Sequence, residues 1–262
     1  MISPMLIGLG AAALILVLVF LLYRSQRAVQ RLSRHLESAA ARLQNMQASF
    51  SRFAPDEVIE RVIANGVTSH GEKKEVTVLF ADLVGFTALS ERVEPTVLVR
   101  ILNGYFESMS RAISDNRGHV STFIGDGILA LFGAHQPNPW QADDAVRAAL
   151  AMRAGLAAYN QELSREGLPN LRIGIGLHRG EGVAGLVGSR DLMEFAFVGR
   201  TVNVAARVQE LTRQYATDII LTDTLLATLG SSFRTRVLPA TPVKGLANPV
   251  RIHAVEGQAT SG

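Results

Sequence analysis

The 262-residue sequence contains no cysteine, so it can form no disulfide, no thiolate metal site and no cysteine nucleophile. Aromatic residues make up only 6% of the chain and charged residues only 19%. The formal net charge is +3. Arginine is dense directly after an apolar N-terminal run (Arg24, Arg27, Arg31 and Arg34), whereas the rest of the chain mixes both signs and has no basic stripe interleaved with aromatic residues. This distribution argues against a nucleic-acid-binding protein.

The segment from Met5 to Leu22 has no charged residue and no strongly hydrogen-bonding side chain. Eighteen residues of helix rise about 27 Å, close to the roughly 30 Å of a bilayer core. No lysine or arginine precedes the run, which disfavours a signal peptide, and Arg24 follows it. The positive-inside rule then places everything after the run in the cytoplasm. We therefore predict an anchor at residues 1–23, in a single-pass protein of the inner membrane.

A regular apolar spacing follows this run. Apolar residues recur at alternating intervals of three and four from Val29 to Phe53, which is the heptad pattern of a coiled coil. An amphipathic helix packed on its own domain or on the membrane would give a similar pattern, but the strict spacing favours a parallel dimer. We predict a coiled-coil signalling helix at 24–54. A short helix and linker are predicted at 55–71, where Pro55 opens the helix and Gly66 ends it.

From Lys74 onward, short apolar strands alternate with amphipathic helices, which indicates one α/β sandwich with helices on a sheet. Two strands are expected on either side of the tight turn at 125–127. The other expected elements are a strand at 76–80, helices at about 98–113 and 145–163, a strand at 171–177, a helix at about 201–215, a strand at 218–221 and a C-terminal hairpin.

Two aspartates follow or join these strands. Asp82 comes where the apolar strand ends, and Asp126 occupies the tip of the turn. Each has an ordinary explanation, as a helix cap or as a turn residue. If their strands are neighbours, however, the carboxylates converge, and paired oxygen ligands suit Mg²⁺ or Mn²⁺ holding a triphosphate. Backbone amides around Gly85 could then approach phosphate oxygens closely.

Four motifs resemble, in order and spacing, the catalytic domain of class III adenylate and guanylate cyclases. They are VTVLFADLVGFT, the FIGDG turn, IGIGLHRGEGVAGLVGS and GRTVNVAARVQELT. We assign 72–256 to this domain and 257–262 to a tail. FSRFAPDEVIERVIANG resembles the helix that commonly precedes the domain in bacterial members. The resemblance implies a ferredoxin-like α/β sandwich that dimerises head to tail, with two active sites at the interface.

The resemblance also implies roles for individual residues. Asp82, Asp126 and the carbonyl of Leu83 match the metal-binding positions, for two Mg²⁺ or Mn²⁺ ions per active site. The partner subunit would supply Asn203 to orient the ribose and Arg207 to neutralise charge developing on the α-phosphate. Without the flanking motif, these two would be an ordinary polar helix face. The remaining expected substrate contacts are Gly85, Phe86, Thr87 and Lys244.

Two positions depart from the family pattern. The purine is usually selected by Lys with Asp or Thr in adenylate cyclases, and by Glu with Cys or a similar residue in many guanylate cyclases. Here the two positions are Thr122 and Ala196, which match neither pattern. A pocket that lacks the usual polar groups loses its main means of rejecting the wrong base. ATP is the default on abundance and on family frequency.

The sequence therefore predicts a phosphorus–oxygen lyase, a homodimeric cyclase that converts ATP, or as second choice GTP, into the 3′,5′-cyclic monophosphate and pyrophosphate. Its expected partners are the nucleoside triphosphate, a second copy of the chain, the lipid bilayer and a membrane-protein regulator. One rival is a catalytically silent domain that only binds nucleotide or dimerises. The unusual base-selecting pair favours that rival, and the retained aspartates, Asn203 and Arg207 argue against it. A coiled-coil scaffold would explain only the N-terminal segments.

Overall fold

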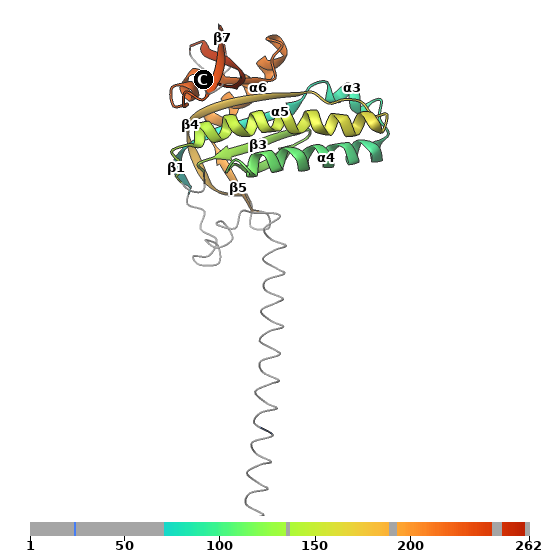
Figure 1. Ribbon diagram of the computed structural model, residues 1–262. Coiled ribbons are helices and arrows are strands. Elements are labelled where there is room, and N and C mark those ends of the chain that lie inside the picture. Colours follow the sequence, from blue (N-terminus) through green and yellow to red (C-terminus); the bar gives the residue numbers. More distant parts are fainter. Residues whose placement is uncertain (1–23, 25–70, 135–136, 189–192, 243–247, 260–262) are drawn as a thin grey trace, which may run out of the picture. The chain divides into compact units, whose positions relative to one another are not determined.

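The computed structural model describes residue 24 and residues 71–134, 137–188, 193–242 and 248–259 (Figure 1). The predicted anchor, coiled coil and short helix lie outside these residues, apart from Arg24. Within the described ranges, no helix is both long and apolar enough to cross a membrane. The strands and helices described from residue 71 onward all belong to one compact unit, Arg61–Gly262.

One sheet runs through this unit in the order β2-β3-β1-β4-β6-β8-β7, with β5 paired to β4. Neighbouring strands are antiparallel except β4 and β6, which are parallel. The strands are β1 (Glu72–Leu83), β2 (His119–Ile124), β3 (Gly127–Phe132), β4 (Ile173–Gly188), β5 (Met193–Val198), β6 (Ile219–Thr222), β7 (Phe233–Thr241) and β8 (Val250–Gln258). The helices are α3 (Phe86–Ser90), α4 (Pro95–Ser114), α5 (Gln141–Arg165), α6 (Arg200–Gln214) and α7 (Asp223–Leu226).

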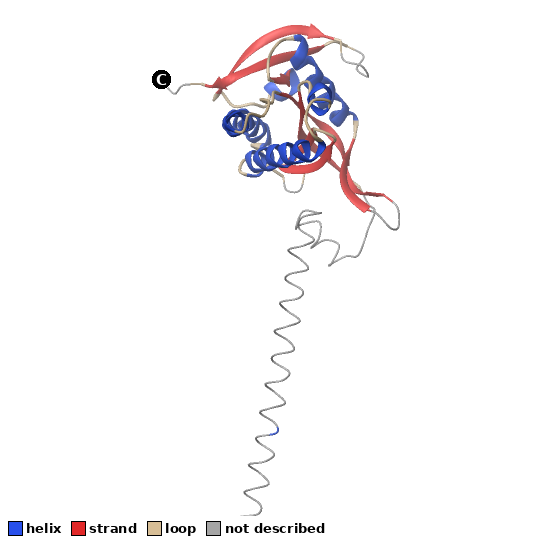
Figure 2. Cartoon of the chain, turned by 90° about the vertical axis from the view of Figure 1, so that its right-hand side faces the viewer, coloured by secondary structure: helices blue, strands red, loops and turns tan. Residues whose placement is uncertain are grey.

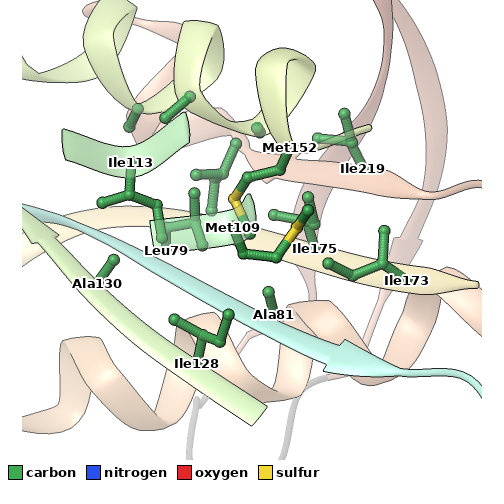
Figure 3. Packing of buried hydrophobic residues seen from close by; sticks show 14 of the residues in the cluster. Leu79, Ala81, Met109, Ile113, Ile128, Ala130, Met152, Ile173, Ile175 and Ile219 are labelled. Carbon is green, nitrogen blue, oxygen red and sulfur yellow. The ribbon is translucent and has the colours of Figure 1, made fainter. Parts of the chain in front are cut away.

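Helices cover both faces of the sheet (Figure 2). Because side chains alternate along a strand, Leu79 and Ala81 of β1 face α4 and α5. Val76 and Val78 face the opposite side, where they share a core with Ala205 of α6. Figure 3 shows the first of these cores, in which methionine side chains from α4 and α5 lie over β1, β3 and β4. Burial on both faces explains why the middle of β1 reads as a continuous apolar run.

The α/β fold predicted from the sequence is confirmed, and the two strands flanking the turn at 125–127 are present. The structure extends two strands beyond their expected ends. β1 begins at Glu72 and β4 continues to Gly188, because the polar start of β1 pairs with the glycine-rich part of β4, Glu72 opposite Ala184. The sequence gives no clear signal for this pairing, because charged and glycine residues have no strong preference for strands. β5, α3 and α7 are elements that the periodicity did not predict.

A partly buried histidine should make the stability of this unit sensitive to acid. Nδ1 of His178 in β4 lies 2.9 Å from Oγ1 of Thr222. Burial, with the nearby charge of Arg200, lowers the pKa of His178 from 6.5 to about 4. The folded chain therefore stays neutral at this ring while the unfolded chain takes up a proton below about 6.5. We expect the free energy of unfolding to fall by up to about 3 kcal/mol between pH 6.5 and pH 4.

Chemical denaturation of the purified chain and of a His178→Gln variant at several pH values measures this effect. Glutamine can keep a hydrogen bond to Thr222 but takes up no proton in this range. The variant should therefore lose stability less steeply with acid than the wild type. Equal slopes for the two proteins would assign the acid sensitivity to other groups.

Candidate active site

Two carboxylates meet at the end of β1. Asp82 is the penultimate residue of that strand, and Asp126 lies in the turn between β2 and β3. Strand β3 pairs with β1, with Ile128 opposite Ala81, so the turn lies beside the strand end. The backbone N–H of Leu83 donates to Oδ2 of Asp126 at 3.3 Å. The side chain of Asp126 also lies close enough to that of Asp82 for a proton shared between them to raise the pKa of Asp82. The structure thus brings together the two carboxylates that the sequence singled out.

Their closeness changes the acidity of the site. Burial, the hydrogen bond to Asp126 and the negative charge of Asp126 raise the pKa of Asp82 to about 6. The guanidinium of Arg213 and the backbone of Leu83 act in the opposite direction. When two carboxylates repel each other and are partly buried from solvent, a cation between them stabilises their charged forms. The electrostatics of the pair therefore favour binding of a positive charge.

The donor set indicates which cation this would be. Asp82, Asp126 and the Leu83 carbonyl offer only oxygen atoms, which Mg²⁺ and Mn²⁺ prefer. In the part of the chain that the structure describes, no three or more His, Asp or Glu side chains are grouped so as to hold a metal. A cation at this pair would need further oxygens, and Mg²⁺ commonly takes them from substrate phosphates. The residues present therefore fit a metal–nucleotide complex better than a self-contained metal site.

Glycines hold the turn against β1. Gly125 has φ +63°, a backbone conformation that residues other than glycine rarely adopt. At Gly127 a Cβ atom would lie 3.1 Å from the carbonyl of Ile124 and 3.3 Å from that of Ala81. A side chain there would press the turn away from β1 and carry Asp126 with it. These two glycines therefore keep the carboxylates together.

The loop after β1 leads from the carboxylate-bearing strand end into α3. Gly85 has φ +80° and immediately precedes α3. Gly85 and Thr87 are exposed, whereas Phe86 is partly buried against the core. This loop follows the carboxylate-bearing strand end directly, so its backbone is accessible beside the pair. Lys244 lies outside the described residues, and its expected contact is untested.

Asn203 and Arg207 are on α6, four residues apart and therefore on one side of the helix. Asn203 is exposed, and Arg207 forms a 3.5 Å ion pair with Glu210. Among the described residues, neither makes a hydrogen bond or ion pair with Asp82 or Asp126. The structure of the single chain thus brings the carboxylates together but leaves this polar pair apart from them.

The two positions that the resemblance assigns to base selection lie on strands that contact each other. Thr122 is in β2 and Ala196 is in β5, and these strands are in contact. Both side chains are partly buried. The hydroxyl of Thr122 makes only a long 3.4 Å hydrogen bond, to the carbonyl of Phe123. Its hydrogen-bonding capacity is therefore largely free for another group.

Arg213 is a site residue that the sequence reasoning missed. Its Nη2 lies 3.3 Å from Oδ2 of Asp82 and 3.4 Å from the carbonyl oxygen of Leu83. It also lines a cavity of about 690 Å³ together with Arg153, Arg172 and Asp218. The alternation along β1 could have given a signal, since it places Asp82 on the side of Val76 and Val78, where α6 lies.

The chain matches the family described as "Adenylate and Guanylate cyclase catalytic domain" over residues 68–257. It therefore belongs to the class III adenylate and guanylate cyclase family. It is 33% identical over 239 residues to an adenylate cyclase of Anabaena cylindrica, an alignment that covers 87% of this chain and 47% of that protein. It is 30% identical to adenylate cyclase 1 of Rhizobium meliloti, over 85% of this chain and 34% of that protein. The chain spans about half the length, or less, of these relatives.

Solved structures that are named as guanylyl cyclases and as adenylyl cyclases share this fold. The guanylyl cyclase Cya2 is 35% identical, with a TM-score of 0.66 over 73% of this chain and 96% of that chain. The adenylyl cyclase CyaB from P. aeruginosa is 28% identical, with a TM-score of 0.68 over 73% of this chain and 98% of that one. The comparisons therefore define a nucleotide cyclase domain and leave the base to be argued from the pocket.

Proposed function

We propose that this chain converts ATP into cyclic AMP and pyrophosphate, as a homodimer with two Mg²⁺ or Mn²⁺ ions in each active site. The observation that carries the proposal is the convergence of Asp82 and Asp126 at the end of β1, where the N–H of Leu83 donates to Asp126 and the proximity of Asp126 raises the pKa of Asp82. Membership of the cyclase family and the adenylate cyclases among its relatives support it.

Each group near the pair has a task in this reaction. Divalent cations bound at Asp82, Asp126 and the Leu83 carbonyl would make the ribose 3′-hydroxyl more acidic and offset charge on the phosphates. The chain from Gly85 to Thr87 would bind the phosphates through its backbone amides. Lys244 would reach the terminal phosphates. The attack of the 3′-oxygen on the α-phosphorus forms one P–O bond and breaks the bond to the β-phosphate, so pyrophosphate leaves.

Asn203 and Arg207 serve this reaction only if a second copy of the chain supplies them. Both are accessible on α6, and a planar, permanently charged guanidinium suits the charge that develops on the α-phosphate. A second observation favours self-association. Five large apolar side chains of β2, β4 and β5 are about half exposed among the described residues, namely Phe123, Ile124, Val183, Val187 and Val198. A monomer gains nothing by exposing them, whereas an interface would bury them.

Discrimination between ATP and GTP should be weak in this chain, about tenfold, because Thr122 and Ala196 offer few hydrogen bonds to a base. The double variant Thr122→Lys with Ala196→Thr should sharpen the preference for ATP, mainly through kcat/KM. Competition assays with both nucleotides measure this. A wild-type preference above about a thousandfold, roughly 4 kcal/mol, would place base recognition in other residues.

We also propose that residues 1–23 anchor the protein in the inner membrane with the cyclase domain in the cytoplasm, where a membrane-protein regulator could act. The uncharged run followed by arginines is the support for this arrangement. Extraction of cell membranes with alkaline carbonate decides it, since an anchored chain stays in the pellet. Release of the chain into the supernatant would contradict an anchor.

The decisive experiment is product identification. The purified chain is incubated with Mn²⁺ and with ATP, GTP, CTP and UTP in competition, and the products are separated by chromatography. Cyclic AMP as the main product supports the proposal, and cyclic GMP as the main product would correct the substrate. Tight nucleotide binding without any cyclic product would favour the catalytically silent alternative, to which the unusual pair at Thr122 and Ala196 points.

A further inference from the structure

We propose that Arg213 is a resident counter-cation of the carboxylate pair, which competes with divalent metal ions for the same oxygen atoms. The inference rests on the proposed function in so far as it assigns those oxygens to metal. Arg213 would then set how tightly the nucleotide-free chain binds metal, and it would delay loading of the site until a metal–nucleotide complex arrives.

The contacts of Arg213 carry this inference. Its Nη2 approaches Oδ2 of Asp82 at 3.3 Å and the carbonyl oxygen of Leu83 at 3.4 Å. These are two of the three groups that fit a divalent cation. Mg²⁺ binds its oxygen ligands at about 2.0–2.1 Å, so a guanidinium on the same oxygens would stand within a few ångströms of the ion. Two positive charges at that separation repel each other, so one must leave for the other to bind.

The position of Arg213 allows it to leave. Its side chain is 55% exposed, and solvent screens an ion pair of this kind. Breaking the ion pair between Arg213 and Asp82 therefore costs little free energy. It stands in the last turn of α6, where the helix end favours a cation whether or not Asp82 is paired. It also lines the open cavity of about 690 Å³, which gives the side chain room to withdraw. The contact with Asp82 is therefore a reversible one.

Competition and a purely structural role predict opposite signs. If Arg213 only held the metal ligands in place, its removal would loosen them and weaken metal binding. If it competes with metal, its removal frees Oδ2 of Asp82 and the Leu83 carbonyl, and metal binding becomes tighter. The sign of the change in metal affinity separates the two roles without any measurement of catalysis.

The experiment measures Mn²⁺ binding to the purified, nucleotide-free chain, by the electron paramagnetic resonance signal of free Mn²⁺. Removing one unit charge close to a partly exposed site should lower the Kd for Mn²⁺ in Arg213→Met by about tenfold, equivalent to about 1.4 kcal/mol. Arg213→Lys keeps the charge and should stay within about threefold of the wild type. The gain in Arg213→Met should shrink at high ionic strength, because salt screens the lost charge.

Arg153→Met is the matched control. Arg153 lines the same cavity, but it contacts Asp218 at 3.6 Å and the carbonyl of Glu256 at 3.1 Å instead of the carboxylate pair. Its removal should leave the Kd for Mn²⁺ unchanged. In an Asp82→Ala background, Arg213→Met should raise the remaining Mn²⁺ affinity by clearly less than in the wild type, because one of the two shared ligands is gone. Thermal unfolding of each variant checks that the fold is intact, and Arg213→Gln provides a second neutral variant.

Unchanged or weaker Mn²⁺ binding in folded Arg213→Met and Arg213→Gln would overturn the proposal. So would an equal gain in Arg153→Met or in the Asp82→Ala background, since either would reveal a general charge effect. Absence of Mn²⁺ binding in every variant would overturn it as well. The proposed cyclase activity is judged separately by the cyclic product of the wild type, so a failure here leaves that assignment standing.

Discussion

Replacing Asp82 or Asp126 by alanine should lower the rate of cyclisation by at least about a thousandfold, since metal ions contribute several kcal/mol of transition-state stabilisation. The two carboxylates lie close together at the end of β1, so each should be needed. The measurement is the rate of cyclic nucleotide formation at saturating Mn²⁺, with thermal unfolding as the test of the fold. Asp82→Ala should also be no less stable than the wild type, because its burial penalty and the repulsion from Asp126 disappear.

Asp115→Ala serves as the control for this experiment. Asp115 is an exposed carboxylate directly after α4, and its removal should leave the rate within about twofold of the wild type. Near-normal turnover in either Asp82→Ala or Asp126→Ala would exclude metal catalysis at the pair. A variant that loses activity only because it unfolds would be recognised by its lower melting temperature.

Mixing two inactive variants should restore activity. In Asp82→Ala the polar pair on α6 is intact, and in Arg207→Ala the carboxylate pair is intact. A heterodimer of the two has one composite site with every group present and one with neither. Random pairing of equal amounts should therefore recover about a quarter of the wild-type activity per chain. The measurement is activity as a function of mixing ratio, after incubation that allows subunits to exchange.

The control mixes Asp82→Ala with Asp126→Ala, which damages the same half of every site. That mixture should stay inactive at all ratios. If Asp82→Ala and Arg207→Ala also stay inactive together, although labelled subunits are seen to exchange, the active site is built within one chain. In that case the separation of Arg207 from Asp82 in the structure would have to close by a movement of α6.

The sequence allowed the carboxylate pair to be predicted because its signals are local. An apolar strand that ends in Asp82 and a glycine-flanked turn that presents Asp126 needed only the pairing of β1 with β3 to converge, and that pairing is present. Arg213 was not predictable in this way. Its contact depends on which face of β1 carries Asp82 and on how the chain returns α6 to that face, which are properties of the whole sheet. The long ladder of β1 and β4 escaped for a similar reason, since its polar and glycine residues gain their strand conformation from pairing rather than from intrinsic preference.

Gly176 has a consequence for how the proposed sites of a dimer communicate. A Cβ atom there would lie 2.3 Å from the backbone N of Gln209, so α6 rests directly on the backbone of β4. The helix is therefore packed rigidly against β4 at this point. Arg213, near the C-terminal end of α6, contacts Asp82 of its own chain. Asn203, near the N-terminal end, and Arg207, at the middle, would serve another copy in the proposed dimer. We expect a helix held in this way to move as one rigid unit. Binding at one site of the proposed dimer would then shift the groups that the same helix contributes to the other site, so the two sites would not act independently.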